Sequence, residues 1–413
     1  MNAIVLILKI CFIIFLIVLS SCRTNSHQET EDDFLRIDLS KVEKRTFLNA
    51  SEVISDIEYV VLETSSNCLI GEGFTMSISD NYVLTFSNNN CLLFSRKGKF
   101  IRKIGQTGNG PADYRGGVFD VKIDEKTEMV YLSNDYSEIV VYRITGQFVK
   151  KIYINELKKI VGGFTLEIEH WKDDLLCAGI NITGKEQHRF IIFNLEGEIV
   201  KYFPNHILYE SGASCNLYHI YCYKELLSFK QGFSDTIFRI TEQFEMVPAI
   251  VFDFPGKKIP EIERYQMHAD DVKYVRSIRE VENYLWLTVT DIGQCLYDKK
   301  NKRLTSFERD PKFRRTIEAP MPDGTTLSRT FFLGGLRNDI DGGLPFEPRY
   351  FSHFQNNRQL VCVYHPWVLK ENLTEEHFAG YKVKNQEAHN RLKNLLTDLD
   401  WEDNPVLMIA TFK

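Results

Sequence analysis

The segment LLFSRKGKFIRKIG (residues 92–105) decides the fold, because its pattern recurs along the chain. It consists of an apolar pair, an aromatic residue, a short polar turn and a second alternating stretch. Four further copies follow: VVYRITGQFVKKIY (140–153), IIFNLEGEIVKYFP (191–204), IFRITEQFEMVPAI (237–250) and CLYDKKNKRLTSFE (295–308). Alternation of apolar and polar residues on both sides of a tight turn predicts a β-hairpin in each copy.

The turn residue distinguishes the copies. Gly98, Gly146 and Gly197 occupy the turn in the first three, and glycine readily takes the positive φ that a tight hairpin needs. Glu242 and Asn301 replace it in the fourth and fifth copies. We therefore expect these last two turns to have a different geometry.

The spacing of the copies indicates a propeller. Their aligned aromatic residues lie 48, 51, 45 and 59 residues apart, at Phe94, Tyr142, Phe193, Phe238 and Tyr297. Two more strand-like segments precede each hairpin, as in VFDVKIDE (118–125) and EMVYLSND (128–135). Four strands in about 45–50 residues is the period of a propeller blade. Two unrelated β-sandwiches are the alternative, and the five aligned hairpins favour the propeller over them.

The end of the chain suggests how the ring closes. We expect FFLGGLRN (331–338) and RQLVCVYHP (358–366) to be inner strands of a sixth blade, and the helical spacing in 385–400 predicts an amphipathic helix. The last strand, NPVLMIATFK (404–413), lacks a hairpin partner, and IEYVVLET (57–64) is the remaining unassigned strand. Pairing the two would remove both free edges.

The predicted fold is thus all-β. It is a six-bladed β-propeller of four-stranded antiparallel blades over residues 34–413, closed by its N- and C-terminal strands, with one amphipathic helix near the C-terminus.

The first 33 residues predict export. The apolar run Ile10–Leu19 has the length of a signal-peptide core, although an uncleaved membrane anchor is the alternative. The following Leu19-Ser20-Ser21-Cys22 resembles the lipobox of bacterial lipoproteins. Residues 1–21 are therefore expected to be a lipoprotein signal peptide, Cys22 the lipidated residue and 22–33 a polar tether.

Composition excludes several function classes. The net charge of −6 falls to −7 when residues 1–21, which include Lys9, are removed. An acidic chain without a basic stripe is a poor nucleic-acid ligand, so we expect no nucleic-acid partner. Seven cysteines remain beyond Cys22, and no CxxC pattern is present. This predicts buried free thiols rather than disulfides, and no metal site or cofactor.

Together these motifs resemble a known family. The lipobox, the IEYVVLET strand, the hairpins, the loop GQTGNGPADY (105–114) and the final strand are similar to six-bladed, NHL-like β-propeller lipoproteins of anaerobic gut Gram-negative bacteria. The fourth and fifth turns and the long segment 309–357 depart from the pattern. The resemblance implies an outer-membrane location, facing either the periplasm or the cell surface. It also implies a binding role in glycan uptake or cell-surface recognition.

The sequence supports a catalytic function less than a binding role. The sequence has no GxSxG nucleophile elbow and no HExxH metal motif. A glycoside hydrolase or lyase using paired carboxylates stays an alternative, as does a scaffold subunit of an envelope complex. Expected partners are the membrane, through the lipid anchor, and a glycan or an envelope protein. Trp367 and Trp401 flank the predicted helix and are candidate sugar-stacking residues.

The long connections between blades are the expected working face. They are residues 105–117, 155–163, 204–215, 255–271 and 309–330, and long loops on a rigid scaffold often carry binding groups. They share one face with the loops between the middle strands of each blade. The candidate ligand-binding residues on that face are Tyr114, Arg115, Asn134, Asp235 and Asp291. Tyrosine offers a stacking surface and arginine a fork of donors, which suits a sugar, a carboxylate or a peptide end.

Overall fold

The structure is a computed structural model. It describes residues 34–115, 117–135, 138–155, 167–180, 184–209, 218–256, 258–268, 271–320, 326–348 and 357–413. The predicted signal peptide 1–21, Cys22 and the tether to residue 33 lie outside these residues. Within the described residues, no helix is both long and apolar enough to cross a membrane.

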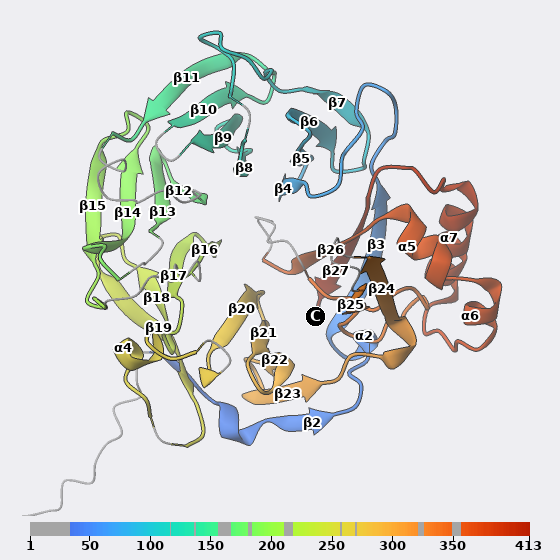
Figure 1. Cartoon of the computed structure of the whole chain (residues 1–413). Coiled ribbons are helices and arrows are strands. Elements are labelled where there is room, and N and C mark those ends of the chain that lie inside the picture. The colour runs from blue at the N-terminus through green and yellow to red at the C-terminus, as the bar shows by residue number, and fades with distance from the viewer. Residues whose placement is uncertain are drawn as a thin grey trace, which may run out of the picture. The chain divides into compact units, whose positions relative to one another are not determined.

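Residues 36–413 form a six-bladed β-propeller, as predicted (Figure 1). Blade 1 contains β4 (Thr75–Ile78), β5 (Tyr82–Ser87), β6 (Asn90–Ser95) and β7 (Phe100–Lys103). Blade 2 contains β8 (Asp120–Asp124), β9 (Met129–Asp135), β10 (Glu138–Arg143) and β11 (Phe148–Tyr153). Blade 3 contains β12 (Ile168–Lys172), β13 (Leu175–Gly179), β14 (His188–Asn194) and β15 (Ile199–Pro204).

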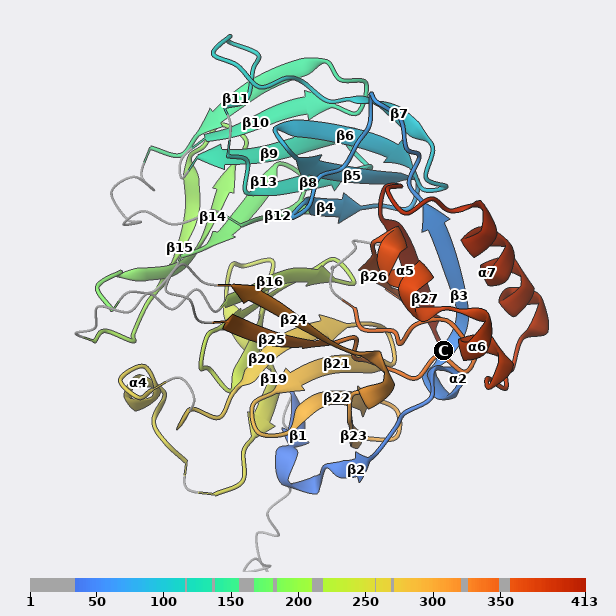
Figure 2. The same ribbon diagram turned by 45° about the vertical axis from the view of Figure 1, so that its right-hand side comes forward.

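The next two blades each carry a fifth strand. Blade 4 contains β16 (Tyr218–Tyr223), β17 (Leu226–Gln231), β18 (Thr236–Ile240) and β19 (Met246–Asp253), with β1 (Leu35–Asp38) beside β19. Blade 5 contains β20 (Val275–Glu280), β21 (Tyr284–Val289), β22 (Gly293–Asp298) and β23 (Arg303–Phe307), with β2 (Glu43–Arg45) parallel to β23. The short helix η1 (Leu39–Lys41) joins the two added strands. The N-terminal segment thus runs along the outer edges of blades 4 and 5 (Figure 2).

Ring closure follows the predicted pairing. Blade 6 has the strand order β26 (Gln359–Tyr364), β27 (Val406–Phe412), β3 (Ile54–Val61). The register places Val406 opposite Val61 and Ile409 opposite Glu58. The last strand of the chain therefore lies between a strand from its C-terminal part and one from its N-terminal part.

The prediction for the rest of blade 6 was partly wrong. Residues 326–332 form β25 (Thr326–Phe332), which pairs with β24 (Arg314–Pro320) in a separate hairpin after η3 (Pro311–Phe313). The chain then leaves the extended conformation at Gly334 and Gly335, and Gly335 has φ +119°. Consequently the segment 331–338 does not supply an inner strand, and this sheet has three strands.

Helices pack against one side of this sixth blade (Figure 1). The predicted amphipathic helix is α7 (Gln386–Asp398), and α5 (Pro366–Asn372) and α6 (Glu375–Ala379) precede it. The single-turn helix α2 (Ala50–Val53) leads directly into β3 of the same blade and packs in its core. The single-turn helix α4 (Glu261–Arg264) lies in the connection between blades 4 and 5. The four shorter helices were not predicted from the sequence, because they span too few residues to show an apolar period.

The hairpin aromatics lie where the repeat predicts. Phe94, Tyr142, Phe193 and Tyr297 are buried, whereas Phe238 is half-buried. Apolar clusters fill the spaces between neighbouring blades, as for blades 1 and 2. The turn glycines have φ between +82° and +85°. In the fourth and fifth hairpins Phe244 and Lys302 take the positive φ instead, so these turns do differ.

The cysteines of the described residues are free thiols, as expected. Cys68, Cys91, Cys177, Cys295 and Cys362 are buried and Cys222 is half-buried. Their surroundings are apolar, and burial raises the pKa of the Cys295 thiol to about 12. They therefore pack as small hydrophobic side chains.

Candidate functional site

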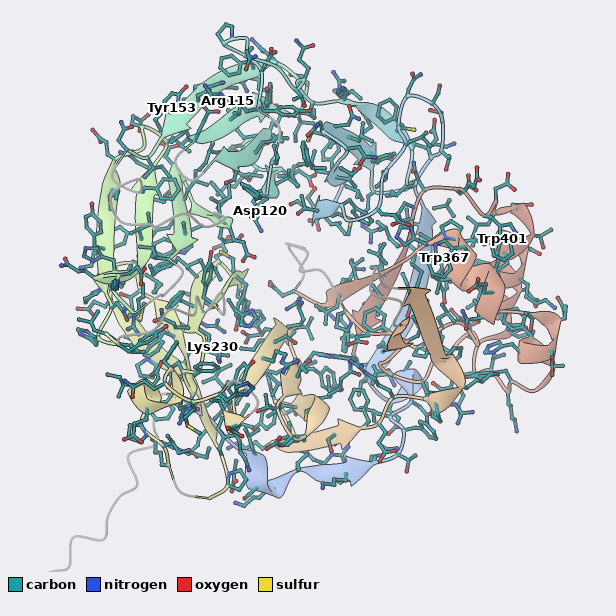
Figure 3. The ribbon with its side chains drawn as sticks, in the orientation of Figure 1. Arg115, Asp120, Tyr153, Lys230, Trp367 and Trp401 are labelled. Atoms are coloured by element: carbon teal, nitrogen blue, oxygen red, sulfur yellow. The ribbon has the colours of Figure 1, made fainter. Side chains whose placement is uncertain are left out.

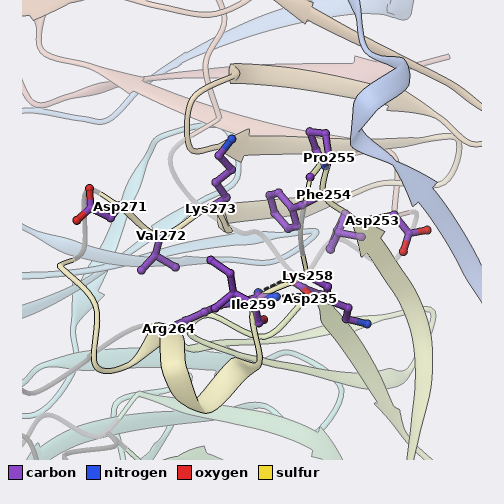
Figure 4. Close-up of a pocket in the computed structure, with 12 residues that line it drawn as sticks. Asp235, Asp253, Phe254, Pro255, Lys258, Ile259, Arg264, Asp271, Val272 and Lys273 are labelled. Atoms are coloured by element: carbon purple, nitrogen blue, oxygen red, sulfur yellow. Dashed lines mark hydrogen bonds and ion pairs between the residues drawn. The ribbon is translucent and has the colours of Figure 1, made fainter.

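A cavity of about 400 Å³ opens beside the connection between blades 4 and 5 (Figure 4). This volume lies within the range of small-ligand pockets. The walls come from the β17–β18 loop, the end of β19 and the connection that contains α4. The lining residues are Asp235, Phe252, Asp253, Phe254, Pro255, Gly256, Lys258, Ile259, Arg264, Asp271, Val272 and Lys273.

A buried ion pair forms the base of this pocket. The Arg264 guanidinium donates to both carboxylate oxygens of Asp235 at 2.5 and 2.6 Å, and the two side chains are only 8% and 16% exposed. Arg264 also donates to the backbone carbonyls of Phe233 and Ile259. The hydrogen bond to Asp235 raises the pKa of the Arg264 guanidinium. A fork of this kind fixes α4 against the β17–β18 loop.

The local sequence explains why a helical turn forms here. Pro260 is the N-cap of α4, and its ring fixes φ, here at −53°. Glu261 and Glu263 occupy the first turn and Arg264 the last, which matches the helix dipole. The turn therefore directs Arg264 inward, toward Asp235.

The mouth of the pocket combines apolar and charged groups. Phe254, Pro255, Ile259 and Val272 supply apolar wall. Lys258, Asp271 and Lys273 are exposed at the rim. Lys273 lies 3.6 Å from the Asp291 carboxylate, in a pair whose side chains are 52% and 61% exposed.

The N-terminal strand also reaches this pocket. Arg36 of β1 donates to both carboxylate oxygens of Asp253 at 3.0 and 3.1 Å. Asp253 is a lining residue, so two of the three carboxylates in the wall are neutralised by arginines.

Two of the five sequence-predicted site residues lie at this pocket. Asp235 lines it, although Arg264 holds both its oxygens. Asp291 contacts the lining residue Lys273. Both come from loops between middle strands, and part of the pocket wall comes from the predicted long connection 255–271. The ligand-binding role of both stays a prediction.

The other three predicted site residues are not among the described residues that line the pocket. The ring of Tyr114 is fully buried among blades 1 and 2, and its hydroxyl donates to the Asn89 carbonyl. A buried ring offers no stacking surface, so that role does not fit its position. Arg115 is exposed on the upper rim in Figure 3, away from the pocket between blades 4 and 5. Asn134 belongs to β9, and its side chain lies outside the described residues.

The two tryptophans also lie away from the pocket. Trp401 is 52% exposed and Trp367 half-buried, and both stand on the helical side of blade 6 (Figure 3).

A second charged cluster lies between the inner strands of blades 2 and 3. Lys122 of β8 lies 3.6 Å from Asp120 and 3.4 Å from Glu169 of β12. Burial raises the pKa of the Asp120 carboxyl to about 6, and Figure 3 shows this residue on the inner side of the ring. Its oxygen also accepts from the Ile168 amide at 3.1 Å. These groups satisfy one another, which indicates a contact between blades.

Four residues of the pocket wall and rim were not predicted from the sequence. Phe254, Lys258, Asp271 and Lys273 carry no motif. The only signal was the length of the predicted connection 255–271, which contains Lys258 and Asp271. Across the described part of the chain, no three His, Cys, Asp or Glu side chains are grouped as metal ligands.

Comparisons with known proteins place the chain in a family. Residues 34–411 match the family described as domain of unknown function DUF4934. No curated protein matches the sequence.

Two solved structures are similar to this chain. A protein from Bacteroides fragilis NCTC 9343 that is assigned as exported is 19% identical, with a TM-score of 0.61 over 92% of this chain and 99% of that one. A member of the DUF4221 family from Bacteroides vulgatus ATCC 8482 is 12% identical, with a TM-score of 0.45 over 87% and 97% of the two chains.

Proposed function

We infer a binding function for this chain, which belongs to the DUF4934 family. It is an exported lipoprotein, anchored through Cys22 in the outer membrane, whose propeller holds a small ligand in the pocket between blades 4 and 5. The observation that carries this proposal is the pocket itself. It combines an apolar wall with a few charged groups on a rigid base, which is the usual composition of a ligand site.

The pocket is built in advance of any ligand. The Asp235–Arg264 pair and the backbone contacts of Arg264 hold its base in one arrangement. Binding therefore does not have to order the base, which lowers the entropic cost of association. Export is supported by the signal sequence and agrees with the assignment of the Bacteroides fragilis protein as exported. A glycan is one ligand class among those that the test must cover.

The test is a ligand-observed NMR screen of the purified chain against neutral sugars, short peptides and small carboxylates. Ile259→Trp places an indole in the cavity, and Ile101→Trp places the same group on the exposed outer strand of blade 1. We expect a ligand signal that Ile259→Trp abolishes and Ile101→Trp retains. A ligand that binds the wild-type chain, Ile259→Trp and Ile101→Trp equally would contradict the assignment of the site.

A further inference from the structure

Two opposite charges stand at opposite ends of the pocket. Figure 4 shows the Asp271 carboxylate at one end and the Lys258 side chain at the other. Both side chains are exposed. Within the described residues, neither has an ion pair or a side-chain hydrogen bond. A ligand that pairs with them therefore does not have to displace a partner seen in the structure.

The remaining charges of the wall are already engaged. Asp235 pairs with Arg264, Asp253 with Arg36, and Lys273 with Asp291. These pairs leave little net attraction for an ion of either sign. Hence, among the described residues, the pocket offers one unpaired carboxylate, Asp271, and one unpaired ammonium, Lys258, at separate positions. These charges do not form a cluster of like sign that would bind a simple anion or cation.

Apolar side chains line the pocket that these charges flank. Phe254, Pro255, Ile259 and Val272 line it together, and in Figure 4 Val272 and Ile259 lie between Asp271 and Lys258. A ligand that fills the pocket would bury an apolar group against them, and the removal of that apolar surface from water favours binding.

We propose that the ligand is a short peptide with free ends and an apolar side chain, its ammonium at Asp271 and its carboxylate at Lys258. The proposal rests on the pocket being the ligand site. A single amino acid carries both charges on one α-carbon and so does not match charges at opposite ends. A neutral sugar leaves both charges unpaired, and a simple anion leaves Asp271 unpaired.

The experiment uses the tripeptide Ala-Phe-Ala and its two blocked forms, with an acetylated N-terminus or an amidated C-terminus. Each is titrated calorimetrically into the full-length chain in detergent. Because the two charged groups are exposed, we expect each block to weaken binding about 2- to 5-fold. Asp271→Asn should remove the preference for the free ammonium only. Lys258→Gln should remove the preference for the free carboxylate only.

Lys97→Gln is the matched control, since Lys97 is an exposed lysine in the blade 1 hairpin turn. It should keep both preferences. Equal affinity of the wild-type chain for the free and blocked peptides would overturn the proposal, as would a complete failure of Ala-Phe-Ala to bind. The blocked peptides test the wild-type protein, so an unstable variant cannot hide the result. If another ligand class binds instead and Ile259→Trp abolishes that binding, the peptide proposal is refuted while the pocket remains the ligand site.

Discussion

Gly98, in the hairpin turn of blade 1, packs against the backbone carbonyl of Val61 at the end of β3. A methyl group on Gly98 would overlap this oxygen. The same contact recurs at the turn of blade 3, where Gly197 packs against the Tyr153 carbonyl on the outer strand of blade 2. The turn of one blade thus rests on the outer strand of the preceding blade. By this comparison the N-terminal strand β3 serves as the outer strand of blade 6.

Because of this contact, substitution of Gly98 should destabilise the fold more than substitution of Gly146, the equivalent turn glycine of blade 2. Gly98→Ala and Gly146→Ala both place an alanine at nearly the same φ, +83° and +85°, which costs an L-residue about 1–2 kcal/mol. At Gly146 the nearest atoms lie 3.6 Å or more from an added methyl. At Gly98 the overlap with Val61 should add about 1–3 kcal/mol. Urea unfolding measures both, and equal losses would contradict the contact at the ring closure.

The two arginines at the pocket should differ in their effect on stability. Arg264→Met leaves the Asp235 carboxylate and two backbone carbonyls without their donor in a mostly buried site. Loss of one partner from a buried pair costs about 3–5 kcal/mol. Arg36→Met removes a pair whose side chains are 50% and 41% exposed, so its cost should be below about 1 kcal/mol. Thermal unfolding compares the stability of the two variants. A larger loss of stability for Arg36→Met would contradict the assignment of Arg264 as the more stabilising arginine.

His377 connects the C-terminal helices to the ring. It is buried, its Nε2 lies 2.7 Å from the Gly342 carbonyl, and its Nδ1 lies 2.9 Å from the Lys312 ammonium. This arrangement requires a neutral ring, with Lys312 donating to Nδ1 and Nε2 donating to Gly342. Burial, together with the Lys312 charge, lowers the pKa of His377 below its ordinary value.

A pH dependence follows from that lowered pKa. In the unfolded chain the imidazole takes up its proton near pH 6.5, and in the folded chain only at lower pH. The unfolded state therefore gains protons first, and the folded state loses stability as the pH falls below about 6.5. His377→Gln can still donate to Gly342 but does not titrate.

The measurement is the free energy of unfolding between pH 5 and pH 8. The wild-type chain should lose more stability on acidification than His377→Gln. Asp120 and Asp341, whose pKa values burial raises to about 6, act in the opposite direction because the folded state binds their protons first. Both proteins contain them, so their contribution cancels in the comparison. Parallel pH profiles would refute the role of His377.

The anchor can be tested separately from the propeller. A cysteine thiol is the acceptor of the lipid, so Cys22→Ala should abolish labelling by a fatty-acid analogue in a bacterial host. Cys68→Ala is the control, because that thiol is buried in the propeller. Labelling that persists in Cys22→Ala would refute the lipobox.

Local pattern was sufficient to predict the blades. A hairpin depends on the alternation of apolar and polar residues and on one turn residue, all within a short stretch of sequence. Five such hairpins, of which LLFSRKGKFIRKIG is the first, revealed the period of the repeat. Closure was also predictable, because β27 and β3 were the two strong strands without a neighbour in the chain. The predicted inner strand at 331–338 failed, because Gly334 and Gly335 end the extended run and a separate hairpin takes β25.

The site depended on the folded chain. Asp235 and Arg264 are 29 residues apart and Arg36 and Asp253 are 217 apart, so no local pattern relates them. Tyr114 shows the same limit, since a tyrosine in a polar loop can face solvent or pack inward, and the neighbouring blade decides which. The sequence by itself determined the blade repeat, its turns and the closing pair, because these depend on residues close in the chain or on strands left unpaired. Only the tertiary structure decided which loops meet at the pocket and which charges are neutralised there, because both depend on contacts between distant segments.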